Sequence, residues 1–261
     1  MKKIVFALFF IMIWGASIGQ GKFVDEYEVT VGYSVFQGDY GEKGDFSSNL
    51  GNSGFLLGGK AYMNFLNYNM ANCYACKHLK FPLIFNVGYS NLSFSQAYNN
   101  SDLTPDLIKL KAFSGSIFQS HIGLGVEYHI GDLNAFSFGS NNFLETFDPF
   151  IGGSIGVTAY VVRLKSSLGD YNTNPNVLPT AFRNGVYDKP GVVPTFAFEG
   201  GFRYKLNNNF SITLNSRWIY YLSDKVDGLV PDSSLVDNDH NDWQFSPSIG
   251  VVFLLKNGGF Y

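Results

Sequence analysis

The sequence predicts an all-β fold, namely a closed antiparallel transmembrane β-barrel of eight strands. Apolar and polar residues alternate with a period of two in eight segments, and no apolar run after Gln20 is long enough for a membrane-spanning helix. In the first segment Tyr27 and Val29 alternate with Glu28 and Thr30. Because successive side chains of a strand point to opposite faces, each segment separates an apolar environment from a polar one. An apolar exterior around a polar interior is the arrangement of a membrane barrel.

Residues 1–19 predict a secretory signal peptide. Lys2 and Lys3 precede an apolar run over 4–14, and small residues follow it. This run is too short for a membrane anchor, which needs about 20 residues. We therefore expect export, cleavage near Gly19, and a single barrel domain over 20–261.

The composition suits a wall that faces lipid. Charged residues make up 15% of the chain and aromatic residues 17%, whereas a typical globular domain has about 25% charged residues. Without Lys2 and Lys3 the remaining chain has 16 basic and 21 acidic residues. No basic patch favours a nucleic-acid partner, so none is expected. We expect a location in the cell outer membrane, in contact with outer-membrane lipids.

The expected strands span 27–37, 54–65, 82–94, 116–130, 149–162, 194–206, 210–221 and 243–255. An even number of strands closes a sheet without an unpaired edge. A soluble β-sandwich or a lipocalin-like barrel also has alternating strands and stays an alternative. The non-apolar face consists largely of Gly, Ser, Thr and Asn, which favours a narrow lumen over a soluble surface. With a periplasmic N-terminus, the long connections 38–53, 95–115, 163–193 and 222–242 lie outside.

The turn at 207–209 predicts the register of the sixth and seventh strands. If the strands pair directly across this turn, Glu199 lies opposite Arg217 in the lumen and Phe198 lies opposite Trp218 outside. A slip by one residue would place Arg217 in lipid, at a cost of about 2–4 kcal/mol.

Charged residues on the inward face predict an ion-pair network in the lumen. Its expected members are Lys60, Glu127, Glu199, Arg203 and Arg217, with Glu199 paired to Arg217 and Lys60, and Glu127 paired to Arg203. Buried charges are stable only when they are paired and hydrogen-bonded. A gate or a solute path is the functional alternative, but side chains just fill an eight-stranded barrel.

Two further groups of polar residues have side chains that could take part in metal, cofactor or redox chemistry. Cys73 and Cys76 lie in a turn of an exported chain, so we expect a local disulfide; haem attachment and metal binding are weaker alternatives. The acidic segment 237–242 has oxygen ligands suited to Ca²⁺ but lacks the glycine and glutamate of an EF-hand loop, which favours a solvated loop. Neither a cofactor nor a metal is expected.

The chain resembles the small eight-stranded outer-membrane barrels of Gram-negative bacteria, the OmpA- and OmpX-like group. The resemblance rests on the alternating strands, the segment 147–153 and the last strand, and the first hairpin is similar to outer-membrane barrels of uncharacterised function. It implies an assembly signal, read by the barrel assembly machinery, at Ser248, Gly250, Val251 and Phe253. Pro247 cannot donate to the ladder, so we expect a bulge there or a strand that begins at Ser248.

The residues favour a structural or adhesive role over catalysis. Ser120 and His121 are adjacent on a strand and face opposite sides, so they cannot act as a nucleophile and its base. We expect no enzyme activity, and a barrel with a filled lumen that acts through long outer loops. It would be structural, adhesive or an accessory subunit with an outer-membrane protein partner. A small solute pore and, with less support, a lipid-modifying barrel enzyme are the alternatives.

Overall fold

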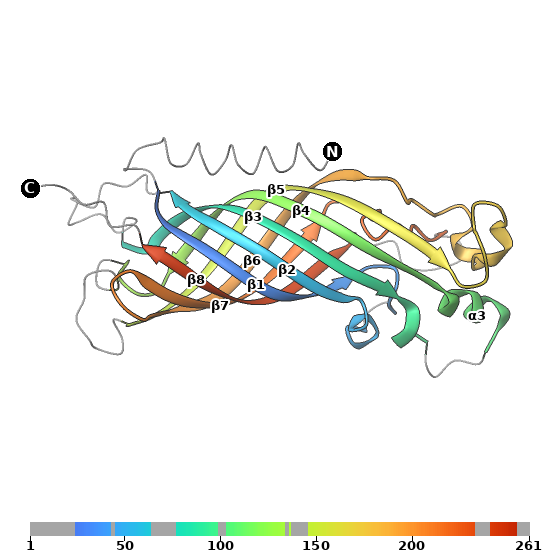
Figure 1. Ribbon diagram of the computed structural model, residues 1–261, viewed down its shortest axis with the longest axis horizontal. Helices are drawn as coiled ribbons and strands as arrows, with labels where there is room; N and C mark the ends of the chain where they lie inside the picture. Colours follow the sequence, from blue (N-terminus) through green and yellow to red (C-terminus); the bar gives the residue numbers. More distant parts are fainter. Residues whose placement is uncertain are drawn as a thin grey trace, which may run out of the picture.

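Eight strands form a closed antiparallel barrel in which each strand pairs with its neighbours in sequence and β8 pairs with β1 (Figure 1). The computed structural model describes residues 24–42, 45–63, 77–98, 103–133, 136, 146–232 and 241–254. The expected signal peptide, Cys73 and Cys76 lie outside the described residues. The strands are β1 (Val24–Gln37), β2 (Ser53–Met63), β3 (Leu79–Ser93), β4 (Phe113–His129), β5 (Phe147–Ser166), β6 (Gly191–Lys205), β7 (Phe210–Tyr221) and β8 (Trp243–Leu254).

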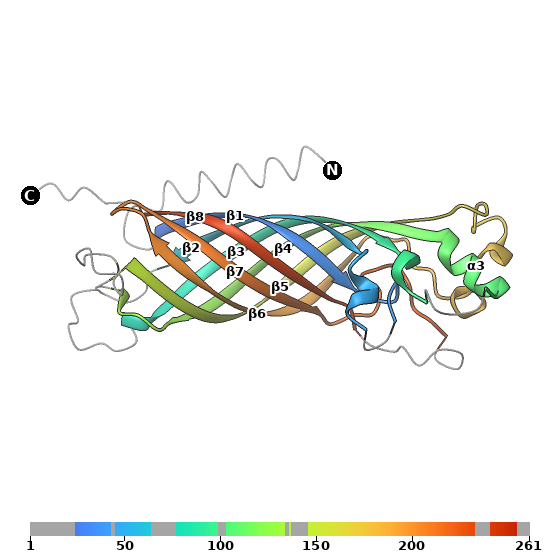
Figure 2. The same ribbon diagram turned by 90° about the horizontal axis from the view of Figure 1, so that it is seen from below.

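The two ends of the barrel differ (Figures 1 and 2). The loop end carries the connections 38–52, 94–112, 167–190 and 222–242; the terminal end carries the start of β1, the end of β8 and the turn 206–209. Helix α3 (Pro105–Ala112) and the short helices η1 (Ser47–Asn49), η2 (Phe94–Gln96), η3 (Pro175–Val177) and η4 (Thr180–Phe182) lie in the connections of the loop end. None of the helices in the described ranges is both long and apolar enough to span a membrane.

The fifth strand is longer than the sequence predicts, since β5 runs over Phe147–Ser166 instead of 149–162. Its pairing with β4 continues from Phe150 to Ser166 without a register shift. Beyond the strand, the amide of Ser167 donates to the carbonyl of Ala112 at the end of α3, over 3.0 Å. The extended strand therefore supports the end of α3, which lies beyond the loop end of the barrel (Figure 2).

The predicted register of β6 and β7 is confirmed. Glu199 pairs with Arg217 and Phe198 pairs with Trp218. The side chain of Asn207 closes the turn by accepting hydrogen bonds from the amides of Asn209 and Phe210, at 2.8 and 3.0 Å. A short turn closed by its own side chain leaves no freedom for a register slip.

The expectation for Pro247 was wrong. β8 begins at Trp243, and its register with β1 is the same on both sides of Pro247, from Gly32↔Ser248 to Val35↔Phe245. Pro247 therefore causes no bulge and does not start the strand. Because its nitrogen carries no hydrogen, the β1–β8 ladder lapses there, whereas Pro247 still pairs with Ser216 of β7.

The apolar face of the strands points outward. Val31 is 57% exposed, Ile155 72% and Phe198 63%, and aliphatic or aromatic residues alternate outward on every strand. Apolar side chains exposed in a continuous band around a barrel are unfavourable in water and favourable in hydrocarbon. The soluble alternative is therefore wrong.

The loop end contains an apolar core that the sequence did not predict. Its buried residues are Phe36, Tyr40, Leu92, Phe94, Ala97, Phe113, Ile117, Tyr160, Val162, Leu178, Phe182, Val193, Ala197, Ile219, Tyr221, Val226 and Leu229. They come from inward positions of the strands and from connections on all sides of the loop end. The connections thus fold over the mouth and form a cap, whose interior is this core.

Candidate functional site: the charged lumen

The lumen near the terminal end is lined by charged side chains, which we call the charged layer: Glu26, Glu28, Lys60, Lys80, Glu127, His129, Asp148, Glu199 and Arg203. They sit at inward positions of β1 to β6, opposite in parity to the lipid-facing residues. None of these nine residues is more than 8% exposed. The layer is therefore a dehydrated cluster in which each charge depends on its protein partners.

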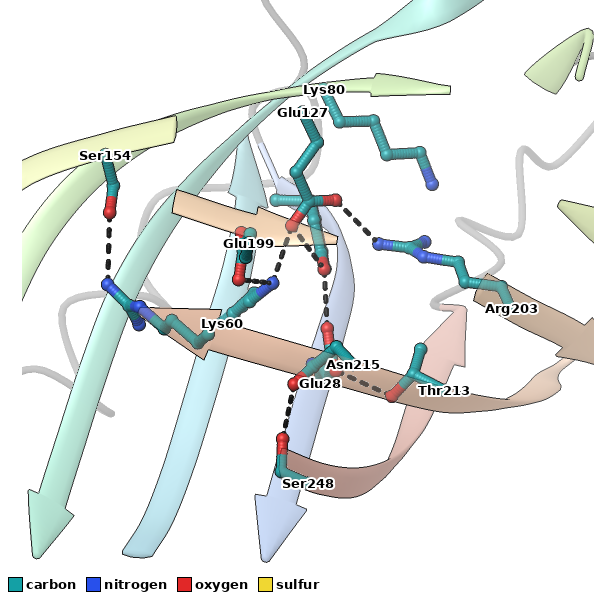
Figure 3. A network of polar contacts seen from close by, with 12 residues as sticks. Glu28, Lys60, Lys80, Glu127, Ser154, Glu199, Arg203, Thr213, Asn215 and Ser248 are labelled. Carbon is teal, nitrogen blue, oxygen red and sulfur yellow. Dashed lines mark hydrogen bonds and ion pairs between the residues drawn. The ribbon is translucent and has the colours of Figure 1, made fainter. Parts of the chain in front are cut away.

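Lys60 on β2 lies between two carboxylates. Its Nζ is 2.7 Å from Oε1 of Glu127 on β4 and 2.9 Å from Oε2 of Glu199 on β6 (Figure 3). The ammonium group also lies 5.5 Å from the ring centroid of Phe150. The side chain of Lys60 thus links β2 to β4 and β6 across the lumen.

Arg203 on β6 forms the second junction. Its Nη1 is 2.7 Å from Oε2 of Glu26, and its Nη2 is 3.4 Å from Oε2 of Glu127. Glu26 also accepts from Lys80, at 2.6 Å to each carboxylate oxygen. The guanidinium lies 4.4 Å from the ring centroid of Tyr62, a cation–π contact. Glu127 is therefore shared between Lys60 and Arg203.

His129 on β4 connects Glu127 to Asp148. Its Nδ1 is 2.6 Å from Oδ2 of Asp148 and its Nε2 is 3.3 Å from Oε2 of Glu127. Carboxylate oxygens only accept hydrogen bonds, so this geometry fits a ring that donates from both nitrogens. His129 therefore bridges the carboxyl groups of Glu127 and Asp148.

The expected pairing of Glu199 with Arg217 was wrong, although the two residues are cross-strand neighbours. The ion pairs among the described residues join Glu199 to Lys60 and do not include Arg217. Nη2 of Arg217 instead donates to Oγ of Ser154 at 3.0 Å and to Nε2 of His121 at 3.2 Å. Lys60 reaches across the lumen to Glu199, and the guanidinium of Arg217 turns toward the loop end, where Nη2 finds neutral acceptors.

His121 has the opposite chemistry to His129. Since its Nε2 accepts from Arg217, its Nδ1 carries the proton and faces the hydroxyls of Thr158 and Thr195, at 3.1 and 3.3 Å. His121 is therefore neutral. The guanidinium of Arg217 and the neutral ring form a polar layer above the charged layer.

A third layer of amides closes the lumen below the apolar core. The side chains of Gln119 and Gln244 are hydrogen-bonded to each other, and the hydroxyl of Tyr221 lies 2.6 and 2.7 Å from their side-chain oxygens, so its single proton is shared between them. Tyr221 also belongs to the apolar core. Along the axis the interior thus changes from charged to polar to apolar, with buried side chains in each layer.

The predicted network lacked five members of the charged layer: Glu28 and His129 lie within the strands that the sequence predicts, and the other three lie just outside them. Glu26 precedes the expected first strand, Lys80 the third and Asp148 the fifth. Each lies an even number of residues from an inward residue, as Glu26 does from Glu28. Extending the alternation by one or two residues at the terminal end would have found all three.

The residues of the expected assembly signal all lie on β8. Ser248 and Gly250 face the lumen, whereas Val251 and Phe253 face outward and are each 38% exposed. Most of the segment 237–242 lies outside the described residues. In the described ranges, no group of three or more His, Cys, Asp or Glu side chains has the arrangement of a metal site.

Closure of the sheet, its apolar outer band and its charged interior define the class of this protein: a small transmembrane β-barrel of the outer-membrane type. The chain matches no family model and no curated protein. Its similarity to known proteins lies in the solved structures of small outer-membrane barrels.

Three of these structures are as follows. Neisserial surface protein A is 11% identical, with 88% of this chain and 96% of that chain covered and a TM-score of 0.46. A major outer membrane protein from Thermus thermophilus is 12% identical, with 88% and 99% covered and a TM-score of 0.42. The outer membrane protein OprG from Pseudomonas aeruginosa is 15% identical, with 90% and 99% covered and a TM-score of 0.40. These similarities concern the fold alone.

Proposed function

We propose that this protein is a barrel that does not conduct solutes and acts through its loop end, as an adhesive or structural element or as an accessory subunit of a larger outer-membrane complex. One observation carries the proposal: successive layers of buried side chains fill the interior from the terminal end to the loop end. Glu127 is 0% exposed in the charged layer, Gln244 0% in the amide layer and Phe36 0% in the apolar core. A water-filled path would leave such side chains accessible.

The loop end offers a surface for a partner. Leu103, Ile108 and Leu168 are 76%, 50% and 48% exposed, and we call them the loop patch. Leu103 and Ile108 belong to α3 or lie just before it, and Leu168 follows Ser167, which is bonded to the end of α3. Exposed apolar residues along and beside one helix can form an interaction site.

Helix α3, which carries Ile108 of the loop patch, is held in place by capping and by packing. The hydroxyl of Thr104 caps α3 by accepting from the amide of Leu107, at 3.2 Å, and Leu107 is buried. A surface held in one conformation binds with a smaller loss of entropy. We propose a protein partner in the outer membrane or on a neighbouring surface, in addition to membrane lipids and the barrel assembly machinery. A nucleic-acid partner is not proposed.

We also propose that the protein is not an enzyme. His121 and His129 are buried and hydrogen-bonded to lumen side chains, so neither is available as a base for a substrate at the surface. Their contacts serve the packing of the interior.

Two measurements test the proposal together. Purified protein is inserted into planar bilayers, and the same protein is cross-linked in cells and extracted in mild detergent. We expect no conductance, and capture of a partner that is lost when the loop patch is changed by Ile108→Ser and Leu168→Ser. Thr173→Ala, at another exposed position of the loop end, is the matched control. Stable conductance without a captured partner would favour the pore instead.

A further inference from the structure

Two buried aspartates lie close together at the mouth of the barrel. Asp227 lies in the connection 222–242 and Asp242 at its end, next to β8; they are 0% and 1% exposed. The amide of Asp39, which follows β1, donates to Oδ2 of Asp227 over 2.6 Å. Oδ1 of Asp227 accepts from the amide of Leu229 at 2.8 Å. Asp227 is thus the joint between the first and the last connection of the loop end.

Asp242 accepts hydrogen bonds from the backbone at Asp227 and next to it. Its Oδ2 accepts from the amides of Val226 and Asp227, at 2.8 and 3.1 Å. Its Oδ1 is buried and has no hydrogen-bond partner. Val226 belongs to the apolar core, so these two bonds set the position of the cap above the mouth.

The two carboxylates face a common point. A Cβ built on Gly38 would collide with Oδ2 of Asp227 and lie only 2.7 Å from Oδ1 of Asp242. Only glycine leaves the space for both oxygens to approach the backbone here. In the described part of the chain, no lysine, arginine or histidine forms an ion pair with either aspartate. The neighbouring Lys225 lies over the ring of Tyr187, at 4.6 Å.

We propose that Asp227 and Asp242 form a proton-operated latch, which holds residues 226–229 on the start of the connection 38–52 while the pair retains a proton and loosens when both carboxylates are ionised.

The surroundings of the pair support a retained proton. Burial and the charge of Asp224 together raise the pKa of Asp227 to about 7, although the amides of Leu229 and Asp39 lower it. Burial and the charges of Asp227, Asp39 and Asp224 raise the pKa of Asp242 well above its usual range. Among the described residues, the other titratable groups that face the pair are the phenols of Tyr40, Tyr160 and Tyr221. None of these described groups carries a positive charge, which agrees with a pair that is neutralised by a proton.

The sign of the pH effect follows from the raised pKa. In an opened connection an aspartate has a pKa of about 3.9. Protonation therefore favours the closed latch fully below about pH 4, and this contribution is lost as the pH rises toward 7. The latch is tightest in acid and loosest at neutral or alkaline pH.

Hydrogen–deuterium exchange of the full-length mature protein in lipid nanodiscs tests the latch. Protection of the amides of Asp39, Val226, Asp227 and Leu229, corrected for intrinsic exchange, is compared between about pH 5 and about pH 8. We expect it to fall about tenfold or more in the wild type. Asp242→Asn places a neutral group at the same position and should remove this dependence. Asp188→Asn, an exposed aspartate of the same cap, is the matched control and should keep it.

Three outcomes would overturn the latch. Corrected protection could be independent of pH in the wild type. Asp242→Asn could keep the wild-type dependence. Protection at about pH 8 could instead rise with added Ca²⁺ and fall with a chelator, in which case a metal ion neutralises the pair. If Asp242→Asn fails to fold, Asp227→Asn and the wild-type profile decide between these results.

Discussion

Glu199 and Arg217 lie directly opposite each other on β6 and β7, yet each finds its partner elsewhere. Glu199 is paired with Lys60 on β2, while Arg217 is bonded to Ser154 and His121 toward the loop end. The barrel therefore separates its charges into layers along the axis instead of pairing them strand by strand. The stability of each layer should depend on the group that has the most hydrogen-bonding partners.

Glu127 is that group in the charged layer. We expect Glu127→Gln to destabilise the barrel by about 3–5 kcal/mol, because Lys60, Arg203 and His129 would lose a shared acceptor while remaining buried. Urea unfolding in lipid vesicles measures the effect. Asp170→Asn, an exposed acidic position of the loop end, should change stability by less than about 0.5 kcal/mol. Equal stability of the two variants would contradict a central role of Glu127.

Arg217 should behave differently from the residues of the charged layer. Arg217→Met removes a buried cation whose bonds go to neutral groups, so we expect a cost of about 1–3 kcal/mol. Its loss frees Nε2 of His121, which should then respond to pH in the same unfolding assay. A cost as large as that of Glu127→Gln would indicate that Arg217 is paired with Glu199 after all.

The two lumen histidines should differ in protonation at neutral pH. His129 faces carboxylates on both nitrogens, and His121 accepts a hydrogen bond from a guanidinium. Nitrogen NMR of histidine-labelled protein in nanodiscs should show protons on both nitrogens of His129 and on Nδ1 alone of His121. His129→Gln and His121→Gln assign the signals. A single proton on His129 would contradict this prediction and would mean that a protonated carboxyl makes one of its two contacts.

The outer wall should reject charge at its most exposed apolar positions. Phe198→Arg places a guanidinium among lipid chains, and we expect a loss of about 2–4 kcal/mol in vesicle unfolding. Val192→Arg is the comparison, because Val192 lies at the loop end of the same strand and is also exposed, at 69%. The cost there should be smaller, since it falls toward the interface. Equal costs would place the lipid boundary elsewhere.

The sequence determined the class of fold, the set of side chains that face lipid, and the register of β6 with β7. Period-two alternation fixes which side chains face lipid, and a three-residue turn leaves a single way to pair β6 with β7, so Glu199 and Arg217 could be placed opposite each other. Inward charges could be recognised wherever the alternation was visible, as for Lys60 and Glu127.

Only the tertiary structure decided which charges meet. Lys60, Glu127, Glu199 and Arg203 come from three strands, and their contacts depend on side-chain reach across a closed lumen, which local pattern does not encode. The cap and its apolar core were hidden for the same reason: where connections cover the mouth, both strand faces become apolar and the alternation disappears. Alternation arises where one strand face contacts lipid and the other contacts a polar lumen. It no longer identifies the inward face where apolar protein replaces the polar lumen.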